Sequence, residues 1–217
     1  MNEILPVKRS KSQARRNYDR LSKVYDLLTV SEKPLIKQGI DLLAIRSGEH
    51  VLEIGCGPVT GLKFVTKALG HQGKAIGLDL SHQMLKKSQG KGITPAPQLI
   101  QADGARLPLR SAEFDAVFSA FTVELFTEDD IRNVLGECRR VLKPLGRLGI
   151  VSLANSPHTL ALQLYEQAHR LFPVAVDCRP IPLAALLKDR GFQLIRSEKT
   201  HNWGLPIGFT LSTKRQA

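Results

Sequence analysis

Three short apolar runs in this chain each end in an acidic residue or a glycine turn. The first covers residues 51–54 and leads into Gly55-Cys56-Gly57, the second ends at Asp79, and the third ends at Asp103-Gly104. In an open parallel sheet, ligands bind in the crevice beyond the carboxyl ends of the strands, so three such ends converge on one ligand. The sequence therefore predicts a nucleoside pocket at one edge of a parallel sheet.

The turn after the first run is built to approach its ligand closely. Gly55 and Gly57 carry no Cβ, so the backbone turns sharply into the next helix and comes near the ligand. Asp79 follows Gly57 by 22 residues, close to the roughly 20-residue spacing at which an acid accepts hydrogen bonds from a ribose diol. These three residues are predicted to bind a nucleoside.

The details of the turn favour an adenosyl ligand over a nicotinamide or flavin dinucleotide. A dinucleotide loop needs a third small residue beneath the pyrophosphate, and this chain has Thr60 at that position. Glu53 lies two residues before the first glycine, where a carboxylate suits an ammonium and a sulfonium better than a pyrophosphate. Asp103 then offers an acceptor to an adenine amino group.

The alternation of strand-like and helical segments predicts the fold class. Strands are expected at residues 50–55, 74–79, 97–102, 114–120 and 146–153, and helices at 12–30 and 34–45. Two further strand-like segments, 192–199 and 205–213, lie close together near the end of the chain. We therefore predict an α/β, Rossmann-like, doubly wound and mostly parallel seven-stranded sheet with an antiparallel edge pair.

Composition is consistent with one cytoplasmic domain. The 217 residues suffice for a single α/β core, divided as a basic tail and lid helices (1–45), a cofactor-binding core (46–155) and an acceptor-side helix with the last strands (156–217). No apolar run approaches the 18 or so residues of a membrane span, and Glu3 and Pro6 interrupt any signal core. The three cysteines lack metal-ligand spacing, so no metal site is expected.

Residues 45–155 resemble class I S-adenosylmethionine-dependent methyltransferases. The resemblance rests on residues 51–58, 79–85, 103–119 and 140–148, and it implies S-adenosylmethionine as the cofactor. In this family pattern, Asp79 holds the ribose hydroxyls, Leu80 and Met84 pack on the adenine, and Asp103 binds its amino group. Many relatives have a third glycine where this chain has Val59, so the loop is expected to shift toward Gly61.

Residues 17–28 resemble the N-terminal helix of the ubiquinone/menaquinone C-methyltransferase group and its phospholipid N-methyltransferase neighbours. That element lies over the cofactor in those relatives. Tyr18 and Tyr25 are seven residues apart on the expected helix, so they either line a lid or anchor the core. The complete set of cofactor-binding residues that these resemblances imply is Tyr18, Tyr25, Glu53, Gly55, Cys56, Gly57, Asp79, Leu80, Met84, Asp103, Gly104, Ala105 and Ser119.

Candidate catalytic residues follow the fourth and fifth strands. Glu124 is a candidate general base or, alternatively, a helix-end or surface carboxylate. His158 enters a helix that is expected over the active site, and its alternative is a structural role. Cys56 is either a small buried residue of the glycine turn or a reactive thiol.

The segments on the acceptor side favour a small lipophilic molecule. Methyltransferases that act on adenine or glutamine amino groups carry an Asn/Asp-Pro-Pro-Tyr/Phe turn after the fourth strand, and this chain has Ser119-Ala120-Phe121-Thr122. The expected helix at 157–173 forms either an apolar roof over the acceptor or a face packed on the sheet. Its apolar stripe consists of Leu160, Leu164, Tyr165, Ala168, Leu171 and Phe172. A quinone precursor or a phospholipid headgroup is the predicted acceptor.

The net charge of +11 favours a polyanionic partner. The basic residues crowd the first thirty positions as Lys8, Arg9, Lys11, Arg15, Arg16, Arg20 and Lys23. This segment suits peripheral contact with an anionic membrane surface; contact with nucleic acid is the weaker prediction, and a plain solvated helix face is the alternative. Two alternative functions remain: an RNA methyltransferase that uses this segment, and a non-catalytic S-adenosylmethionine-binding regulator. The oligomeric state is not readable.

Overall fold

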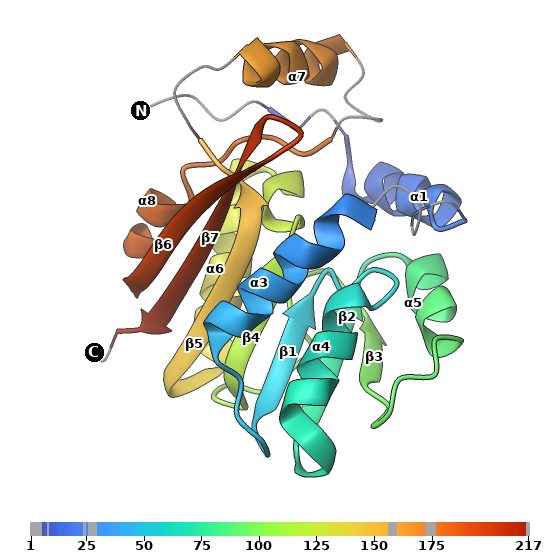
Figure 1. Ribbon diagram of the computed structural model, residues 1–217, viewed down its shortest axis with the longest axis vertical. Coiled ribbons are helices and arrows are strands. Elements are labelled where there is room, and N and C mark those ends of the chain that lie inside the picture. The colour runs from blue at the N-terminus through green and yellow to red at the C-terminus, as the bar shows by residue number, and fades with distance from the viewer. Residues whose placement is uncertain are drawn as a thin grey trace.

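The computed structural model describes residues 6–7, 9–23, 25, 30–155, 160–171 and 177–215. Its centre is a seven-stranded sheet in the order β3-β2-β1-β4-β5-β7-β6 (Figure 1). The strands are β1 (His50–Ile54), β2 (Lys74–Asp79), β3 (Gln98–Gln101), β4 (Phe114–Ala120), β5 (Leu142–Leu153), β6 (Phe192–Asn202) and β7 (Leu205–Lys214).

The pairing of the strands confirms the predicted fold class. β1 pairs in parallel with β2 and β4, and the parallel ladder extends to β3 on one side and β5 on the other. β7 lies antiparallel between β5 and β6. The carboxyl ends of the first four strands therefore meet at one edge of the sheet, as the crevice argument requires.

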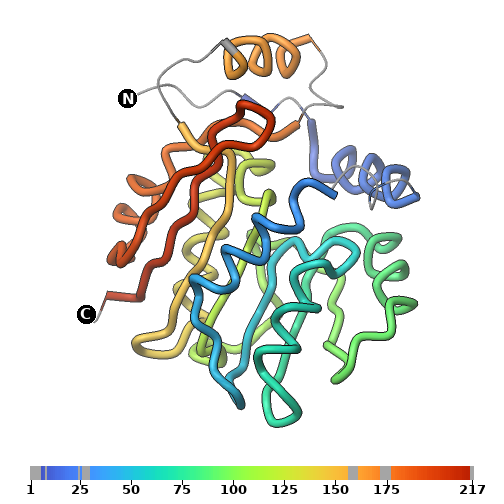
Figure 2. The backbone as a smooth tube through the Cα atoms, viewed as in Figure 1, coloured from blue at the N-terminus to red at the C-terminus, as the bar shows by residue number. Residues whose placement is uncertain are grey.

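Helices cover both faces of the sheet (Figures 1 and 2). One face carries α3 (Lys33–Leu43), α4 (Thr60–Leu69) and α5 (His82–Gln89), and the other carries α6 (Glu128–Val141) and α8 (Leu183–Asp189). Two more helices, α1 (Lys11–Leu21) and α7 (Leu160–Leu171), lie beyond the edge where the parallel strands end (Figure 1). Within the described residues there are also three short 3-10 turns, namely η1 (Val30–Glu32), η2 (Gly70–Gln72) and η3 (Val123–Leu125).

Alternation along the strands divides the core into two layers. In β1, Leu52 and Ile54 pack with the buried residues of α6 and α8, whereas Val51 packs with those of α3 and α4. Gly39 lets α3 lie directly on the sheet, because an added Cβ there would come within 2.3 Å of Cγ2 of Val151. Burial on both faces accounts for the continuous apolar character of the central strands.

The N-terminal helix is shorter than the predicted helix over residues 12–30. Its start is fixed by a capping box between Ser10 and Gln13, but α1 ends at Leu21. The Ser22 hydroxyl donates to the carbonyl of Asp19 at 2.8 Å, and Nζ of Lys87 donates to the carbonyl of Ser22 at 2.7 Å. These bonds occupy carbonyls that a continuing helix would use, so the prediction of one helix to residue 30 was wrong.

Among the described helices, none has both the length and the hydrophobicity to span a bilayer.

Candidate functional site

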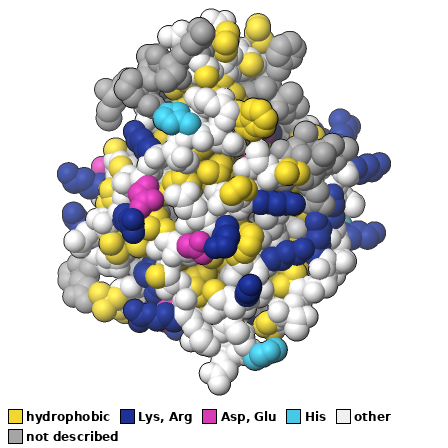
Figure 3. Space-filling view, viewed as in Figure 1, with side chains coloured by type: hydrophobic (Ala, Val, Ile, Leu, Met, Phe, Trp, Pro, Cys, Tyr) yellow, Lys and Arg dark blue, Asp and Glu magenta, His cyan; other side chains and the backbone are white. Residues whose placement is uncertain are grey.

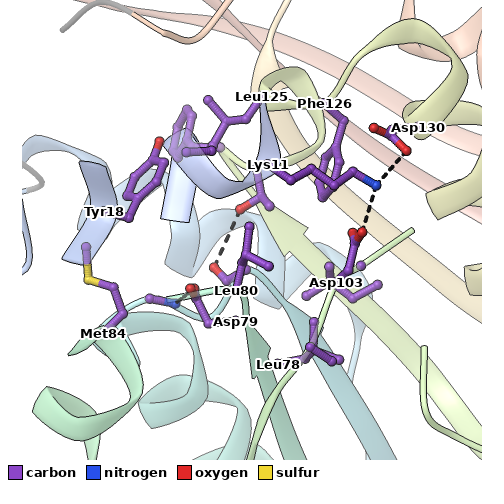
Figure 4. Close-up of a pocket in the computed structure, with 18 of the residues that line it drawn as sticks. Lys11, Tyr18, Leu78, Asp79, Leu80, Met84, Asp103, Leu125, Phe126 and Asp130 are labelled. Atoms are coloured by element: carbon purple, nitrogen blue, oxygen red, sulfur yellow. Dashed lines mark hydrogen bonds and ion pairs between the residues drawn. The ribbon is translucent and has the colours of Figure 1, made fainter. Parts of the chain in front are cut away.

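A pocket opens at the edge of the sheet where β1, β2 and β3 end (Figure 4). The loop after β1 and the ends of β2 and β3 form one side, α1 covers it, and the segment from η3 into α6 closes the other side. Of the residues predicted from the sequence, those that line it are Tyr18, Tyr25, Gly55, Gly57, Asp79, Leu80, Met84, Asp103 and Gly104.

Asp79 is held by two backbone amides at the end of β2. Its Oδ2 accepts from the Gly57 amide at 2.9 Å, and its Oδ1 accepts from the Ser81 amide at 2.8 Å. Burial raises the pKa of this carboxyl, while both hydrogen bonds oppose the rise. Each oxygen retains a second lone pair for a ligand hydroxyl, so a fixed acceptor faces the pocket.

The glycine loop makes the sharp turn that the sequence predicts. Gly55 has φ 71° and Gly57 has φ 49°, both in the left-handed region. A Cβ on Gly55 would lie 2.2 Å from the Thr122 hydroxyl, so no larger residue fits. Val59 takes φ 62°, and the loop therefore keeps a left-handed turn at the position where many relatives have glycine.

Glu53 lies beneath the loop, not in the pocket lining. It is 3% exposed, and its Oε2 has no hydrogen-bond partner. Its carboxyl fills the space that a side chain on Gly61 would need, because an added Cβ there would come within 2.1 Å of Oε1. Burial, followed by the charge of Asp79, raises the pKa of Glu53 well above its usual range. Because burial disfavours the charged form of this carboxyl and Glu53 lies outside the pocket lining, its contact with the positive part of a cofactor stays a prediction.

Asp103, at the end of β3, is engaged by a lysine from the covering helix. Nζ of Lys11 lies 2.7 Å from Oδ2 of Asp103 and 2.8 Å from Oδ1 of Asp130, in the first turn of α6 (Figure 4). The lysine thus ties α1 to both sides of the pocket. These contacts are partly exposed, so the ion pairs contribute little stability by themselves.

Comparisons with known proteins identify the kind of domain that contains this pocket. A family model for the methyltransferase domain matches residues 51–146, the segment that contains the glycine loop, Asp79 and Asp103. This segment of the chain is a methyltransferase domain. It is 30% identical over 161 residues to demethylmenaquinone methyltransferase of Lactobacillus johnsonii, covering 72% of this chain and 64% of that protein.

Other relatives agree on the domain. The ubiquinone/menaquinone biosynthesis C-methyltransferase of Pseudomonas fluorescens is 32% identical over 133 residues, covering 58% of this chain and 50% of that protein. The chain thus spans between half and two thirds of these two relatives. A solved complex from Haloferax volcanii contains a chain, bound to the Trm112 methyltransferase activator, with a TM-score of 0.78, 14% identity and coverage of 94% of this chain and 98% of that one. This last likeness shows the fold alone.

Three of the predicted cofactor-binding residues support the methyltransferase pocket from outside its lining. Cys56 is buried, its Sγ would lie 2.9 Å from a Cβ added to Gly77, and burial raises its thiol pKa well above the usual range, which disfavours a nucleophile. Ala105 donates its amide to Oδ1 of Asp103 at 2.9 Å. The Ser119 hydroxyl donates to the carbonyl of Ile54 at 3.0 Å and joins β4 to β1 just below the loop.

The two tyrosines meet at the pocket although they do not share a continuous helix. Their ring centroids are 6.3 Å apart with an interplanar angle of 60°. Tyr18 donates its hydroxyl to Oδ2 of Asp177 at 2.8 Å, and Arg9 lies 2.7 Å from the same carboxylate. A second anchor joins Asp19 to the start of α5, because its Oδ1 accepts from the Ser81 hydroxyl at 2.6 Å. The N-terminal segment is thus tied to both halves of the domain.

Neither candidate catalytic residue is found in the described pocket lining. Glu124 is fully buried in η3, and its Oε1 accepts from the Leu153 amide at 3.0 Å. Arg179 donates to the carbonyls of Glu124 and Phe126. Burial raises the pKa of Glu124 to about 8, and the charges of Glu32 and Asp177 add to the rise. His158 lies outside the described residues, so its role stays a prediction.

The stripe predicted on the helix after β5 does not face a single direction. Leu162 is buried and Tyr165 packs against the core, with its hydroxyl on the carbonyl of Cys178 at 3.2 Å. Leu164 and Leu171 instead point to solvent, at 62% and 71% exposure. The prediction that these two leucines face a roof or the sheet was wrong, because α7 buries the face of Leu162, Tyr165 and His169.

Several residues that line the pocket were not predicted as site residues from the sequence. Lys11 contacts carboxylates 92 and 119 residues away, a pairing that no local spacing reveals. Leu125, Phe126 and Asp130 line the side opposite Asp79. The capping threonine at 127, which accepts from the Asp130 amide at 3.2 Å, marks the helix start that positions them and is the one readable clue.

Deletion of residues 1–30 is expected to leave the sheet folded, to accelerate cofactor exchange and to lower methyl transfer. The reason is that α1 has no buried residues and neither core layer contains a described residue before Leu35, whereas a lid excludes water and completes a site. Circular dichroism and stopped-flow cofactor release measure the two effects. Tyr18→Phe should accelerate release more mildly; a deletion that unfolds the protein would make the tyrosines core residues.

Proposed function

We propose that this chain transfers the methyl group of S-adenosylmethionine to a small lipophilic acceptor, with a reduced isoprenoid quinone precursor as the first candidate. The observation that carries the proposal is the 30% identity with demethylmenaquinone methyltransferase across 72% of the chain. The alignment covers only 64% of that relative, so part of the relative is not matched by this chain. The acceptor is therefore a proposal for this chain.

The residues of the pocket support binding and positioning of the cofactor. Asp79 is proposed to hold the ribose hydroxyls, Leu80 and Met84 to pack on the adenine, and Asp103 to accept from its amino group. When bound, S-adenosylmethionine supplies an activated methyl group on a sulfonium. The chain's contribution is to hold the two reactants in line and exclude water, and such positioning supplies roughly 7–11 kcal/mol of the barrier reduction.

The second part of the proposal is peripheral contact with an anionic membrane, where a lipophilic acceptor resides. Arg15, Arg16, Arg20 and Lys23 are exposed on and just after α1. Arg9 and Lys11 are instead engaged with carboxylates, so the basic surface is smaller than the sequence suggests. Figure 3 shows Lys and Arg side chains gathered on the side of the molecule formed by α1, α4 and α5.

Incubation with tritium-methyl S-adenosylmethionine and fractionated lipid, RNA and protein tests the acceptor class. We expect label in the isoprenoid quinone fraction after chemical reduction of the quinones, and a mass gain of one methyl group in a demethylated naphthoquinol. Label in phospholipid would show that the acceptor is a phospholipid, which is still lipophilic, and not a quinone precursor. Label in RNA would favour the RNA methyltransferase instead, and cofactor binding with no transfer to any fraction would favour a regulatory protein.

A further inference from the structure

Large apolar side chains are exposed at the end of the molecule that holds the pocket. Leu164 and Leu171 lie on the outer face of α7, and Trp203 is 84% exposed at the tip of the β6–β7 hairpin. The hairpin tip contacts the start of α7, since a Cβ on Gly204 would lie 3.0 Å from Cβ of Ala161. Figure 3 shows hydrophobic side chains on the part of the surface formed by α7. We name Leu164, Leu171 and Trp203 the outer apolar face.

The backbone holds Trp203 outward at a conformational cost. Asn202 pairs with Leu205, so Trp203 and Gly204 form a two-residue hairpin loop. Their φ angles are 53° and 76°, the left-handed values of a type I′ turn, in which asparagine or aspartate usually precedes the glycine. A bulky aromatic residue is an outlier at such a position. Backbone strain that is kept on an exposed side chain points to a function for that side chain.

The charge around this face suits an anionic surface. Among the described side chains of α7, those of Gln163, Leu164, Gln167, Arg170 and Leu171 are exposed, and the carboxylate of Glu166 is half-buried. Lys199 and His201 are exposed near the hairpin tip. Tryptophan is enriched at membrane interfaces, where its apolar ring and its N–H group are both accommodated.

We infer that the outer apolar face docks on the surface of an anionic lipid bilayer, with Trp203 and the two leucines entering the headgroup region. The role of this docking surface rests on the proposed function. α7 and the hairpin tip lie at the same end of the sheet as the pocket (Figure 1). A membrane-resident acceptor then reaches the pocket without crossing bulk water. α1, which carries the exposed Arg15, Arg16 and Arg20, lies at this end of the molecule as well (Figure 1).

The chain contains a single tryptophan, which makes Trp203 a direct probe of docking. Full-length protein is titrated with vesicles of phosphatidylcholine and phosphatidylglycerol at three to one. We expect a blue shift and an increase of tryptophan emission, with quenching by brominated acyl chains. An emission spectrum that stays that of a solvent-exposed indole would overturn the inference, as would a vesicle-free blue shift that grows with protein concentration, because the occupant would then be a second copy.

Matched variants locate the contact. Leu164→Gln combined with Leu171→Gln is expected to lower vesicle partitioning at least tenfold, because the substitutions remove apolar groups that would leave water. Leu145→Gln is the control, since Leu145 is 65% exposed near the start of β5, at the opposite end of the sheet. Equal loss in both variants, or loss in neither, would contradict the assignment. Thermal unfolding of each variant verifies that it is folded.

The failure of docking and the failure of the proposed function are separable. Calorimetry measures S-adenosylmethionine binding by the outer-face variants without vesicles, and we expect wild-type affinity because none of these residues lines the pocket. If the wild-type protein binds vesicles but transfers no methyl group to quinones, the docking proposal is supported and the quinone acceptor is contradicted. Transfer to quinones without any vesicle binding would sustain the acceptor and remove the docking surface.

Discussion

Asp79→Ala is expected to weaken S-adenosylmethionine binding by roughly 10- to 100-fold, because a hydrogen bond to a charged group contributes about 1.5–3 kcal/mol. The substitution also removes the acceptor for the amides of Gly57 and Ser81, and the first of these bonds joins the glycine loop to the end of β2. Asp79→Asn keeps an oxygen acceptor and is expected to lose less affinity. Isothermal titration calorimetry with S-adenosylmethionine and its demethylated product measures the change.

Asp41→Ala provides the matched control for this prediction. Asp41 is an exposed aspartate of α3 that pairs with Lys37 on the surface and lies outside the pocket lining. Its replacement should leave cofactor affinity unchanged. Equal affinities of the Asp79→Ala and wild-type proteins would remove Asp79 from the site. Tighter binding of NAD than of S-adenosylmethionine by the wild-type protein would contradict the cofactor assignment itself.

Glu124→Gln is expected to stabilise the protein increasingly as the pH rises from about 4.5 to about 8. Across this range the folded protein keeps the Glu124 proton that the unfolded chain releases, because the pKa rises from 4.5 to about 8 on folding. The wild-type protein therefore loses stability as the pH increases, by about 1.4 kcal/mol per pH unit for a fully shifted group. Glutamine does not ionise, so the variant avoids a loss of a few kcal/mol.

Urea unfolding measures this difference in stability. The measurements are made at about pH 5, 6.5 and 8, which roughly cover the range between the two pKa values of Glu124. Near pH 5 the two proteins should be almost equally stable, because a protonated glutamate and a glutamine can both accept from the Leu153 amide. Glu128→Gln is the control, since Glu128 is 52% exposed on the neighbouring helix and pairs with Arg132 on the surface. Stability curves of wild type and Glu124→Gln that stay parallel with pH would show that burial does not hold this carboxyl protonated.

The residues of the site that lie at strand ends could be predicted from the local sequence. Gly55, Gly57, Asp79 and Asp103 follow directly from strand ends, and parallel pairing brings those ends together. The antiparallel edge pair was also predicted, because the strand-like segments 192–199 and 205–213 lie close together in the sequence. Such features need only a short stretch of chain and the rules of sheet geometry.

Features that depend on distant partners could not be predicted. The end of α1 at Leu21 depends on a lysine of α5, and the position of Lys11 depends on carboxylates of two other elements. In α7 the apolar residues form two overlapping stripes, and periodicity alone does not say which one the core takes. Glu124 was interpreted as a general base or as a helix-end or surface carboxylate, yet the η3 turn places it inside the core.

If α1 acts as a lid, the bridge from Lys11 to Asp103 makes lid closure and the proposed cofactor contact depend on the same carboxylate. If Asp103 accepts from the adenine amino group, the lysine keeps Asp130 and shares Asp103, so the two equilibria are thermodynamically linked. If closure of the lid changes the affinity for the cofactor by some factor, then binding of the cofactor changes the open–closed equilibrium of the lid by the same factor. The partly exposed bridge also weakens as salt increases, so ionic strength alone shifts both equilibria together.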